Sequence, residues 1–319
     1  AAMGRGGNAE AHRLYLLGMH FVDQFTDDGM RNGIAALEQA VALDPGYAVA
    51  WARLAYSYGL QGAFGWVPVL EGYRKARGAV ERALALAPDL PEGHIVLSTI
   101  QSMDDWDYSA AEASARRALE LAPGSPIALE IAGTLLTRLG RLEEAEKVLL
   151  RGNELDPLSS RNCGNIGYLY RVMHRWADAE HWYRKSLELA PARIATHHMI
   201  ANGMMQQGRP DEALAESKLE PAEWARLTSY AVLHWLSGRR AESDAALAEL
   251  IAKHSTDSAF QIAAVRTVRG EINEAFEWLD RGITTRDGGM VLLKMEPTFE
   301  PLHADPRWPE YLRKVGFEA

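Results

Sequence analysis

Apolar side chains recur along this chain at the spacing of amphipathic helices, and the phrase Leu-x-Pro repeatedly closes such a stretch. Proline ends a helix because it has no amide hydrogen and clashes with the preceding turn. The five copies end at Pro45, Pro88, Pro123, Pro157 and Pro191, with intervals of 43, 35, 34 and 34 residues. The longer first interval predicts extra residues in a loop at Gln61–Val69. The recurrence predicts a series of helix–turn–helix repeats.

Side-chain size also alternates within each repeat, with small residues on one helix facing large residues on the other. The clearest examples are Trp51, Leu54, Ala55 and Tyr58 in a first helix, and Ala145, Leu149 and Gly152 in a second helix. Two antiparallel helices can approach to about 8–9 Å only where a small side chain meets a large one. The pattern therefore predicts tightly packed helical hairpins.

The turns between paired helices have their own signature, a glycine or histidine followed by arginine. It occurs as Gly140-Arg141, His174-Arg175, Gly208-Arg209 and Gly238-Arg239. Glycine at this position tolerates the left-handed backbone that ends many helices. These dipeptides therefore predict the turns of the fourth to the seventh repeat.

The pattern predicts an all-α superhelix of about eight repeats over residues 9–283. Their approximate bounds are 9–45, 46–88, 89–123, 124–157, 158–191, 192–221, 222–255 and 256–283. Residues 1–8 are interpreted as a tag scar or linker. Residues 284–319 contain four prolines and predict an irregular cap of short helices before Trp308–Val315. Such a cap covers the last apolar face of a stacked array.

These residues and spacings resemble the tetratricopeptide repeat superfamily over nearly the whole chain. A narrower resemblance is to the C-terminal repeat regions of bacterial class III adenylate/guanylate cyclases and winged-helix transcriptional regulators. It is carried by Ala11–Gly18, Tyr47–Ala55, Asp105–Asp107 and Phe299–Trp308. The resemblance implies a part in a larger bacterial signalling protein, with a catalytic or DNA-binding region upstream. No cyclase or winged-helix motif occurs in this chain.

Composition narrows the possible partners. Lys plus Arg is 34 and Asp plus Glu is 43, which gives a net charge of −9. An acidic chain disfavours binding to nucleic acid and to anionic membranes.

The single cysteine, Cys163, cannot form an internal disulfide. There is no apolar run of 18 residues, so no membrane insertion is predicted. We expect a cytoplasmic location, and a periplasmic one fits equally well.

Candidate chemistry is sparse. Phosphate-binding loops, nucleophile elbows and zinc motifs are missing, so we expect no catalytic, cofactor or metal site. Asp104–Asp107 is interpreted as an inter-helix turn with capping aspartates and a packing tryptophan, rather than a cation site. Neighbouring His197 and His198 diverge by about 100° on a helix and cannot easily share a metal ion. Cys163 occupies a packing position and predicts an inert buried thiol.

A partner would contact the inner face, which the first helix of each pair lines. The helical period turns six candidate residues of the fifth to seventh repeats toward it, Arg161, Tyr168, Arg171, His198, Asn202 and Trp235. Arg138 of the fourth repeat lies nearby. Donors, an aromatic face and an amide suit a peptide backbone or a carboxylate. The resemblance adds that related arrays bind terminal carboxylates with Lys, Asn and Arg. These inner positions hold no Lys, which argues against such a clamp.

Three functions remain open on the sequence alone. The leading hypothesis is a module that binds a protein or peptide on the inner face. The alternative is a structural spacer that self-associates as a homo-oligomer through its terminal faces, around Trp308 and the first helix. An enzyme with a site between repeats is the least favoured, since it needs a pocket with converging titratable groups.

Overall fold

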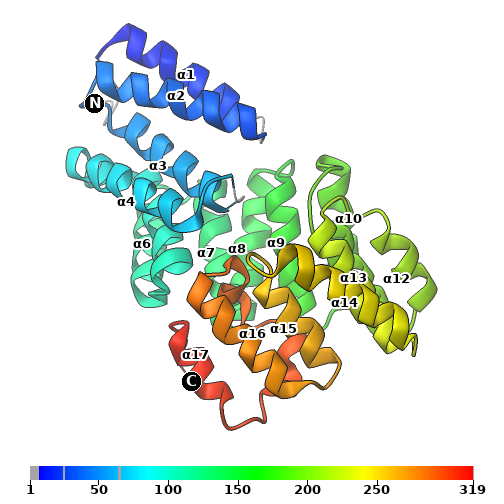
Figure 1. The fold of residues 1–319 in the computed structure, drawn as a ribbon. Coiled ribbons are helices and arrows are strands. Elements are labelled where there is room, and N and C mark those ends of the chain that lie inside the picture. Colours follow the sequence, from blue (N-terminus) through cyan, green and yellow to red (C-terminus); the bar gives the residue numbers. More distant parts are fainter. Residues whose placement is uncertain (1–6, 24–25, 64–65, 319) are drawn as a thin grey trace. The chain divides into compact units, whose positions relative to one another are not determined.

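The structure is a computed structural model that describes residues 7–23, 26–63 and 66–318. It divides into two compact units, Ala1–Ala132 and Gly133–Ala319, and the division falls within one helix. Every regular element in the described ranges is a helix, and no strand occurs there (Figure 1). The prediction of an all-α fold of helical repeats is therefore confirmed.

Unit 1 consists of three helix pairs and the start of a seventh helix. The elements are α1 (Ala9–Val22), α2 (Asp27–Leu43), α3 (Ala48–Ala63), α4 (Val69–Leu86), α5 (Pro91–Ile100), η1 (Gln101–Asp105), α6 (Tyr108–Leu121) and α7 (Pro126–Leu139). The loop predicted at Gln61–Val69 separates α3 from α4, and its residues 64–65 lie outside the described ranges. Of the supposed linker, residues 1–6 also lie outside them. Asn8 caps α1 by accepting from the Glu10 and Ala11 amides.

Unit 2 contains the remaining pairs and the C-terminal segment. The elements are α8 (Leu142–Leu155), α9 (Ser160–Val172), α10 (Trp176–Leu189), α11 (Thr196–Gln206), α12 (Pro210–Ser217), α13 (Glu223–Leu236), α14 (Arg240–His254), α15 (Ala259–Val268), α16 (Ile272–Thr285), η2 (Gly288–Leu292), η3 (Pro297–Leu302) and α17 (Trp308–Lys314). Of the first helices, α11 contacts α13 and α13 contacts α15, whereas α9 is connected to α11 through α10. Together they form the inner face of unit 2.

The alternation of small and large side chains packs the hairpins as predicted. A Cβ atom added to Gly133 would lie 2.5 Å from a Leu149 side-chain atom, and one added to Gly167 would lie 2.6 Å from the Tyr183 ring. Both distances are too short for a real contact, so only glycine fits. These glycines stand on first helices and face the large residues of the second helices.

The predicted turns adopt the left-handed backbone that their residues favour. Gly140, Gly208 and Gly238 have φ angles of 85°, 71° and 76°, and His174 has 57°. The arginine after the turn links two repeats. Arg209 donates to Glu212 of its own helix over 3.0 Å, and to Glu180 of the preceding repeat over 2.7 Å. In Gly208-Arg209, the glycine thus allows the turn at the helix end and the arginine connects two neighbouring repeats.

The aspartate cluster of unit 1 lies at the junction before α6, as predicted, but Asp104 and Asp105 end the helix η1 and only Asp107 caps a helix. Asp107 caps α6 by accepting from the Ala110 amide over 2.9 Å. Trp106 has a φ angle of 57° and is only 7 % exposed, so it packs inward. Asp105 does not cap a helix, and instead accepts from Arg77 over 2.6 Å.

The C-terminal segment has two parts with different roles. The last helix, α17, covers α16, where the Tyr311 and Phe276 rings lie 4.8 Å apart and the Tyr311 hydroxyl donates to Asp280 over 2.6 Å. The preceding residues 288–302, which we call the inner strap, pack against α15. The Phe299 and Phe260 rings lie 5.0 Å apart. The predicted capping role therefore describes α17, whereas the inner strap lies against the inner face of unit 2.

Candidate functional site

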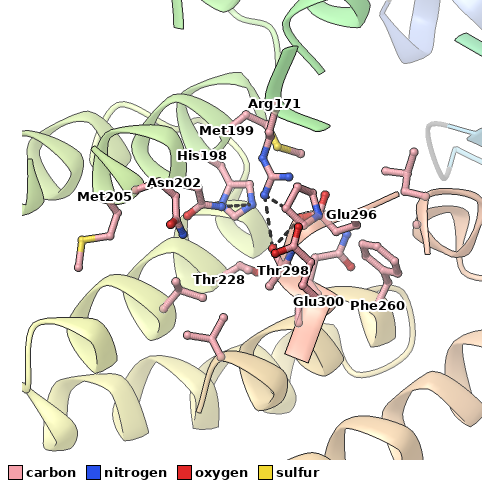
Figure 2. A pocket seen from close by; sticks show the side chains of 18 of the residues that line it. Arg171, His198, Met199, Asn202, Met205, Thr228, Phe260, Glu296, Thr298 and Glu300 are labelled. Carbon is pink, nitrogen blue, oxygen red and sulfur yellow. Dashed lines mark hydrogen bonds and ion pairs between the residues drawn. The ribbon is translucent and has the colours of Figure 1, made fainter. Parts of the chain in front are cut away.

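A cavity of about 410 Å³ lies between the inner face of unit 2 and the inner strap. Side chains from α9, α11, α13 and α15 line one side of it, and the inner strap supplies the other (Figure 2). It has an apolar part and a polar end, which come from different turns of the same helices.

The apolar part of the cavity is built by helical spacing. Residues four apart on a helix point the same way. On α13 this places Val232 and Leu236 on the cavity side, and on α15 Ala264 and Val268. Met205 of α11 continues the wall, and its flexible thioether side chain can adapt to different ligand shapes. Leu236 is 45 % exposed, so the apolar wall reaches the surface.

The polar end centres on a buried ion pair. The Arg171 guanidinium of α9 lies 2.6 Å from a Glu296 carboxylate oxygen of the inner strap, and both side chains are 5 % exposed. Burial opposes the charge on Arg171, but Glu296 together with Tyr183 and Tyr168 gives a net rise in the pKa of Arg171. Thr298 donates to the same carboxylate over 2.6 Å. The inner strap is thus joined to α9 by a buried charge pair (Figure 2).

His198 of α11 is held beside this pair as a neutral ring. Burial, and secondly the positive charge of Arg171, lower the pKa of His198 to about 4. The ring Nδ1 lies 2.7 Å from the Ser229 hydroxyl oxygen, and Nε2 lies 3.2 Å from the Asn202 side-chain nitrogen. Because the Asn202 amide donates, Nε2 is the acceptor and the ring proton stands on Nδ1. Neither ring nitrogen is left for a ligand.

Several buried polar atoms around the cavity have no hydrogen-bond partner within the described part of the chain. They include Nε and Nη1 of Arg171, Oδ1 of Asn202 and Oε1 of Gln261. All three residues line the cavity. Buried polar groups are nearly always paired in folded proteins, so unpaired donors and acceptors at a cavity indicate a place for a ligand or ordered water.

The structure brings together only some of the residues predicted from the sequence. Arg171, His198 and Asn202 line the cavity. Tyr168 does not line the cavity. Burial, and secondly the Glu296 carboxylate, raise the pKa of its hydroxyl well above its ordinary value. Arg138 lies close enough to act on the same hydroxyl electrostatically.

Arg161 and Trp235 do not line the cavity. Trp235 lies between two guanidinium groups, those of Arg240 at 3.3 Å and Arg269 at 4.6 Å from its ring centroid. Its neighbour Leu236 lines the cavity instead. On α13 the lining residues Thr228, Val232 and Leu236 are four residues apart, so the predicted inward side of α13 differs at its last turn, where Leu236 replaces Trp235.

Sequence reasoning missed the residues that the inner strap contributes, Glu296, Thr298 and Glu300. Glu300 lies 2.8 Å from His174 at the edge of the cavity. The inner strap comes after the last repeat in the chain, and its residues do not have the spacing of the repeats. No periodic signal in the sequence therefore connects these residues with the inner face. The two Glu-Pro dipeptides, Glu296-Pro297 and Glu300-Pro301, were visible only as helix breakers.

Two other residues singled out in the sequence have structural partners. Cys163 is fully buried, as predicted, and burial raises the pKa of its thiol. His197 contacts Glu216 over 2.7 Å, whereas His198 contacts Ser229. Neighbouring histidines thus point to different partners.

Among the described residues, no helix combines the length and the apolar character needed to cross a membrane.

Comparisons with known proteins support the fold. No family model matches the chain. A segment of 112 residues, 34 % of this chain, is 34 % identical to protein O-mannosyl-transferase Tmtc1 of Drosophila melanogaster, and it spans 13 % of that protein. Among solved structures, a tetratricopeptide repeat protein from Parabacteroides merdae matches with a TM-score of 0.55 and 12 % identity, over 84 % of this chain and 100 % of the other.

The human IFIT1 dimer, solved with m7Gppp-AAAA, matches with a TM-score of 0.67 and 14 % identity, over 86 % of this chain and 72 % of the other. At these identities the likeness concerns the fold. The chain therefore has a tetratricopeptide-type helical repeat fold, as its sequence pattern predicts.

Proposed function

We propose that this chain is a protein-binding module that takes a peptide segment of a partner protein into the cavity between α9, α11, α13, α15 and the inner strap. The observation that carries the proposal is the cavity itself, of about 410 Å³, with an apolar wall that reaches the surface at Leu236. Clefts of this size with a few placed polar groups are the usual form of a recognition site.

The polar end suits peptide recognition better than catalysis. A peptide backbone offers alternating N–H donors and carbonyl acceptors. The Asn202 and Gln261 amide oxygens accept the former, and the unpaired Arg171 donors suit the latter. A general base needs a free, titratable group, but His198 has both ring nitrogens engaged and Arg171 is paired with Glu296.

The alternative function, a self-associating spacer, has weaker support. It expects exposed apolar faces around Trp308 and the first helix. Trp308 is 5 % exposed and its ring lies 4.9 Å from His303, whereas Leu16 on the first helix is 53 % exposed. A size measurement in solution separates the two, since the spacer requires a stable oligomer. The relation to cyclase and winged-helix regulators, the signalling context and the cytoplasmic location stay predictions.

The test uses two exposed leucines of unit 2, one at the cavity and one away from it. Leu236 is 45 % exposed and lines the cavity, whereas Leu219 is 62 % exposed in the turn after α12 and does not. Binders to the wild-type chain are selected from a library of random 12-residue peptides displayed on phage. Their affinities are then measured by fluorescence polarisation for Leu236→Glu and Leu219→Glu.

We expect Leu236→Glu to weaken the selected peptides at least tenfold, because it puts a carboxylate into the apolar wall. Leu219→Glu should change affinity less than twofold. Equal effects of the two variants, or none, contradict the proposed site. The capped oligonucleotide m7Gppp-AAAA serves as a second probe in the same assay. Its binding to the wild-type chain, with loss in Leu236→Glu, would assign the cavity to RNA instead.

A further inference from the structure

We propose, on the basis of the proposed function, that the cavity selects a peptide segment with a lysine or arginine next to an apolar side chain, and that Glu300 of the inner strap recognises the positive charge. The inner strap is then a wall of the binding site that determines its specificity. Four observations on the lining of the cavity lead to this ligand.

The positive charge at the cavity is already paired. Arg171 is the single arginine in the lining, which contains no lysine among the described residues, and its guanidinium lies 2.6 Å from Glu296. Both side chains are 5 % exposed. A ligand carboxylate could take Arg171 only by leaving Glu296 buried without a cation, which is strongly unfavourable. An acidic peptide is therefore a poor ligand.

The negative charge at the cavity is in excess. The lining carries two carboxylates, Glu296 and Glu300, against one arginine. Glu300 is 49 % exposed, and its partner His174 is 51 % exposed, at 2.8 Å. Glu300 stays half-exposed despite this contact, whereas Glu296 is enclosed together with Arg171. A cationic side chain from a ligand can reach this half-exposed carboxylate from solvent.

Aromatic rings stand at the same edge of the cavity. Trp176 lies beside His174, with ring centroids 5.3 Å apart, and both line the cavity together with Trp224. The face of an indole ring attracts ammonium and guanidinium groups. A lysine or arginine placed near Glu300 thus meets a carboxylate and an aromatic surface together.

The rest of the cavity suits an uncharged neighbour. Val232, Leu236, Val268 and Met205 form an apolar wall. The unpaired amide oxygens of Asn202 and Gln261 accept main-chain N–H groups of a bound segment. The lining thus complements a basic residue at the rim, an apolar side chain inside and a peptide backbone between them.

The experiment repeats the phage selection on charge variants of the full chain. Glu300→Gln removes the charge at the cavity, and Glu300→Lys reverses it. The matched control is Glu310→Gln on α17, whose carboxylate is 60 % exposed and pairs with Lys314 away from the cavity. Affinities of wild-type-selected peptides are measured at low and high salt, and thermal melting confirms that each variant folds.

We expect peptides selected on the wild-type chain to be enriched in lysine and arginine next to an apolar residue. Glu300→Gln should weaken them threefold to tenfold and reduce the salt dependence of binding, whereas Glu310→Gln should leave both unchanged. Selection on Glu300→Lys should enrich aspartate and glutamate instead. The same charge preference on the wild-type chain and on Glu300→Lys would overturn the inference.

This outcome is distinguishable from a failure of the proposed function. Peptides that Leu236→Glu weakens, but that show no preference for charge, leave the binding site in place and reject the role of Glu300. A library that yields no peptide sensitive to Leu236→Glu rejects the site itself, and the role of Glu300 with it.

Discussion

Arg171 and Arg175 lie four residues apart at the end of α9 and in the turn after it, yet their surroundings differ sharply. Arg175 is 44 % exposed, donates to Asp178 over 2.8 Å and lies 3.1 Å from Glu146 of the preceding repeat. Arg171 is 5 % exposed and pairs with Glu296 of the inner strap. The ion pairs of Arg175 have a spacing that recurs in another repeat, whereas the ion pair of Arg171 does not recur among the described residues.

The difference shows which ion pairs a repeat sequence can predict. Arg175 finds its partners 3 and 29 residues away, and Arg209 finds Glu212 and Glu180 at the same two separations. The pairs of Arg175 lie at the surface and contribute little to stability, and the pair between Arg209 and Glu180 is only partly buried. The pair between Arg171 and Glu296 occurs once, is buried, and is expected to matter far more when broken.

The largest effect is expected from breaking the buried pair. Arg171→Met should lower the free energy of unfolding by about 3–5 kcal/mol, because it leaves the Glu296 carboxylate buried without a cation. The double variant Arg171→Met with Glu296→Gln should recover most of this loss, since no buried charge remains. Urea unfolding followed by circular dichroism measures both. A loss below about 1 kcal/mol in the single variant would show that the pair is not buried in solution.

A smaller effect is expected from acid acting on His198 in the same buried end. Its pKa of about 4 in the folded chain is below the ordinary value of 6.5, so the unfolded chain binds the proton more readily. Stability should therefore fall as pH decreases from 6.5 to 4, by about 3 kcal/mol from this ring. The surrounding charges are Arg171 from α9, Glu296 from the inner strap, and Glu220, which accepts from the His198 amide.

The contribution of His198 is isolated by comparing variants across this pH range. His198→Asn removes the titrating ring, so its unfolding free energy should depend less steeply on pH than that of the wild-type chain. His181→Gln, at an exposed position on α10, should keep the wild-type slope. Parallel curves for the wild-type chain and His198→Asn would contradict the burial of the ring.

The smallest effect is expected from the exposed arginine. Arg175→Ala should lower the free energy of unfolding by about 1 kcal/mol or less, because its ion pairs are solvated. The arginine also stacks over the Tyr170 ring at 4.2 Å, so part of the loss should persist in high salt, whereas the ion-pair part should not. Urea unfolding at low and high salt measures the two parts. A loss as large as that of Arg171→Met would abolish the distinction between the two arginines.

The helices themselves were predictable because their signals are local. The seventh repeat is predicted at about 222–255, and α13 and α14 together run from Glu223 to His254. Its turn falls at Gly238, where a φ angle of 76° suits glycine. The small residues that let the helices approach were also visible as a pattern. The hydrophobic period, the helix-breaking residues and the side-chain sizes all act within one or two helical turns. They can therefore be recognised in the sequence.

The candidate site was predictable only in part. The inward positions of Arg171, His198 and Asn202 follow from the helical period, and these residues line the cavity. On α13 the lining continues from Val232 to Leu236, four residues on, so Trp235 does not line the cavity. Trp235 instead packs with Arg240 and Arg269, contacts that no single-helix pattern contains.

The sequence by itself determined the all-α repeat fold, the helix ends and the left-handed turns, because each depends on neighbours within one repeat. Only the tertiary structure decided that residues 288–302 pack against the inner face and that Glu296 neutralises Arg171. Contacts between segments so far apart in the chain obey no period. They depend on which oppositely charged groups pair in the folded chain, here Arg171 and Glu296. The free energy of such a pair depends on the residues packed around it.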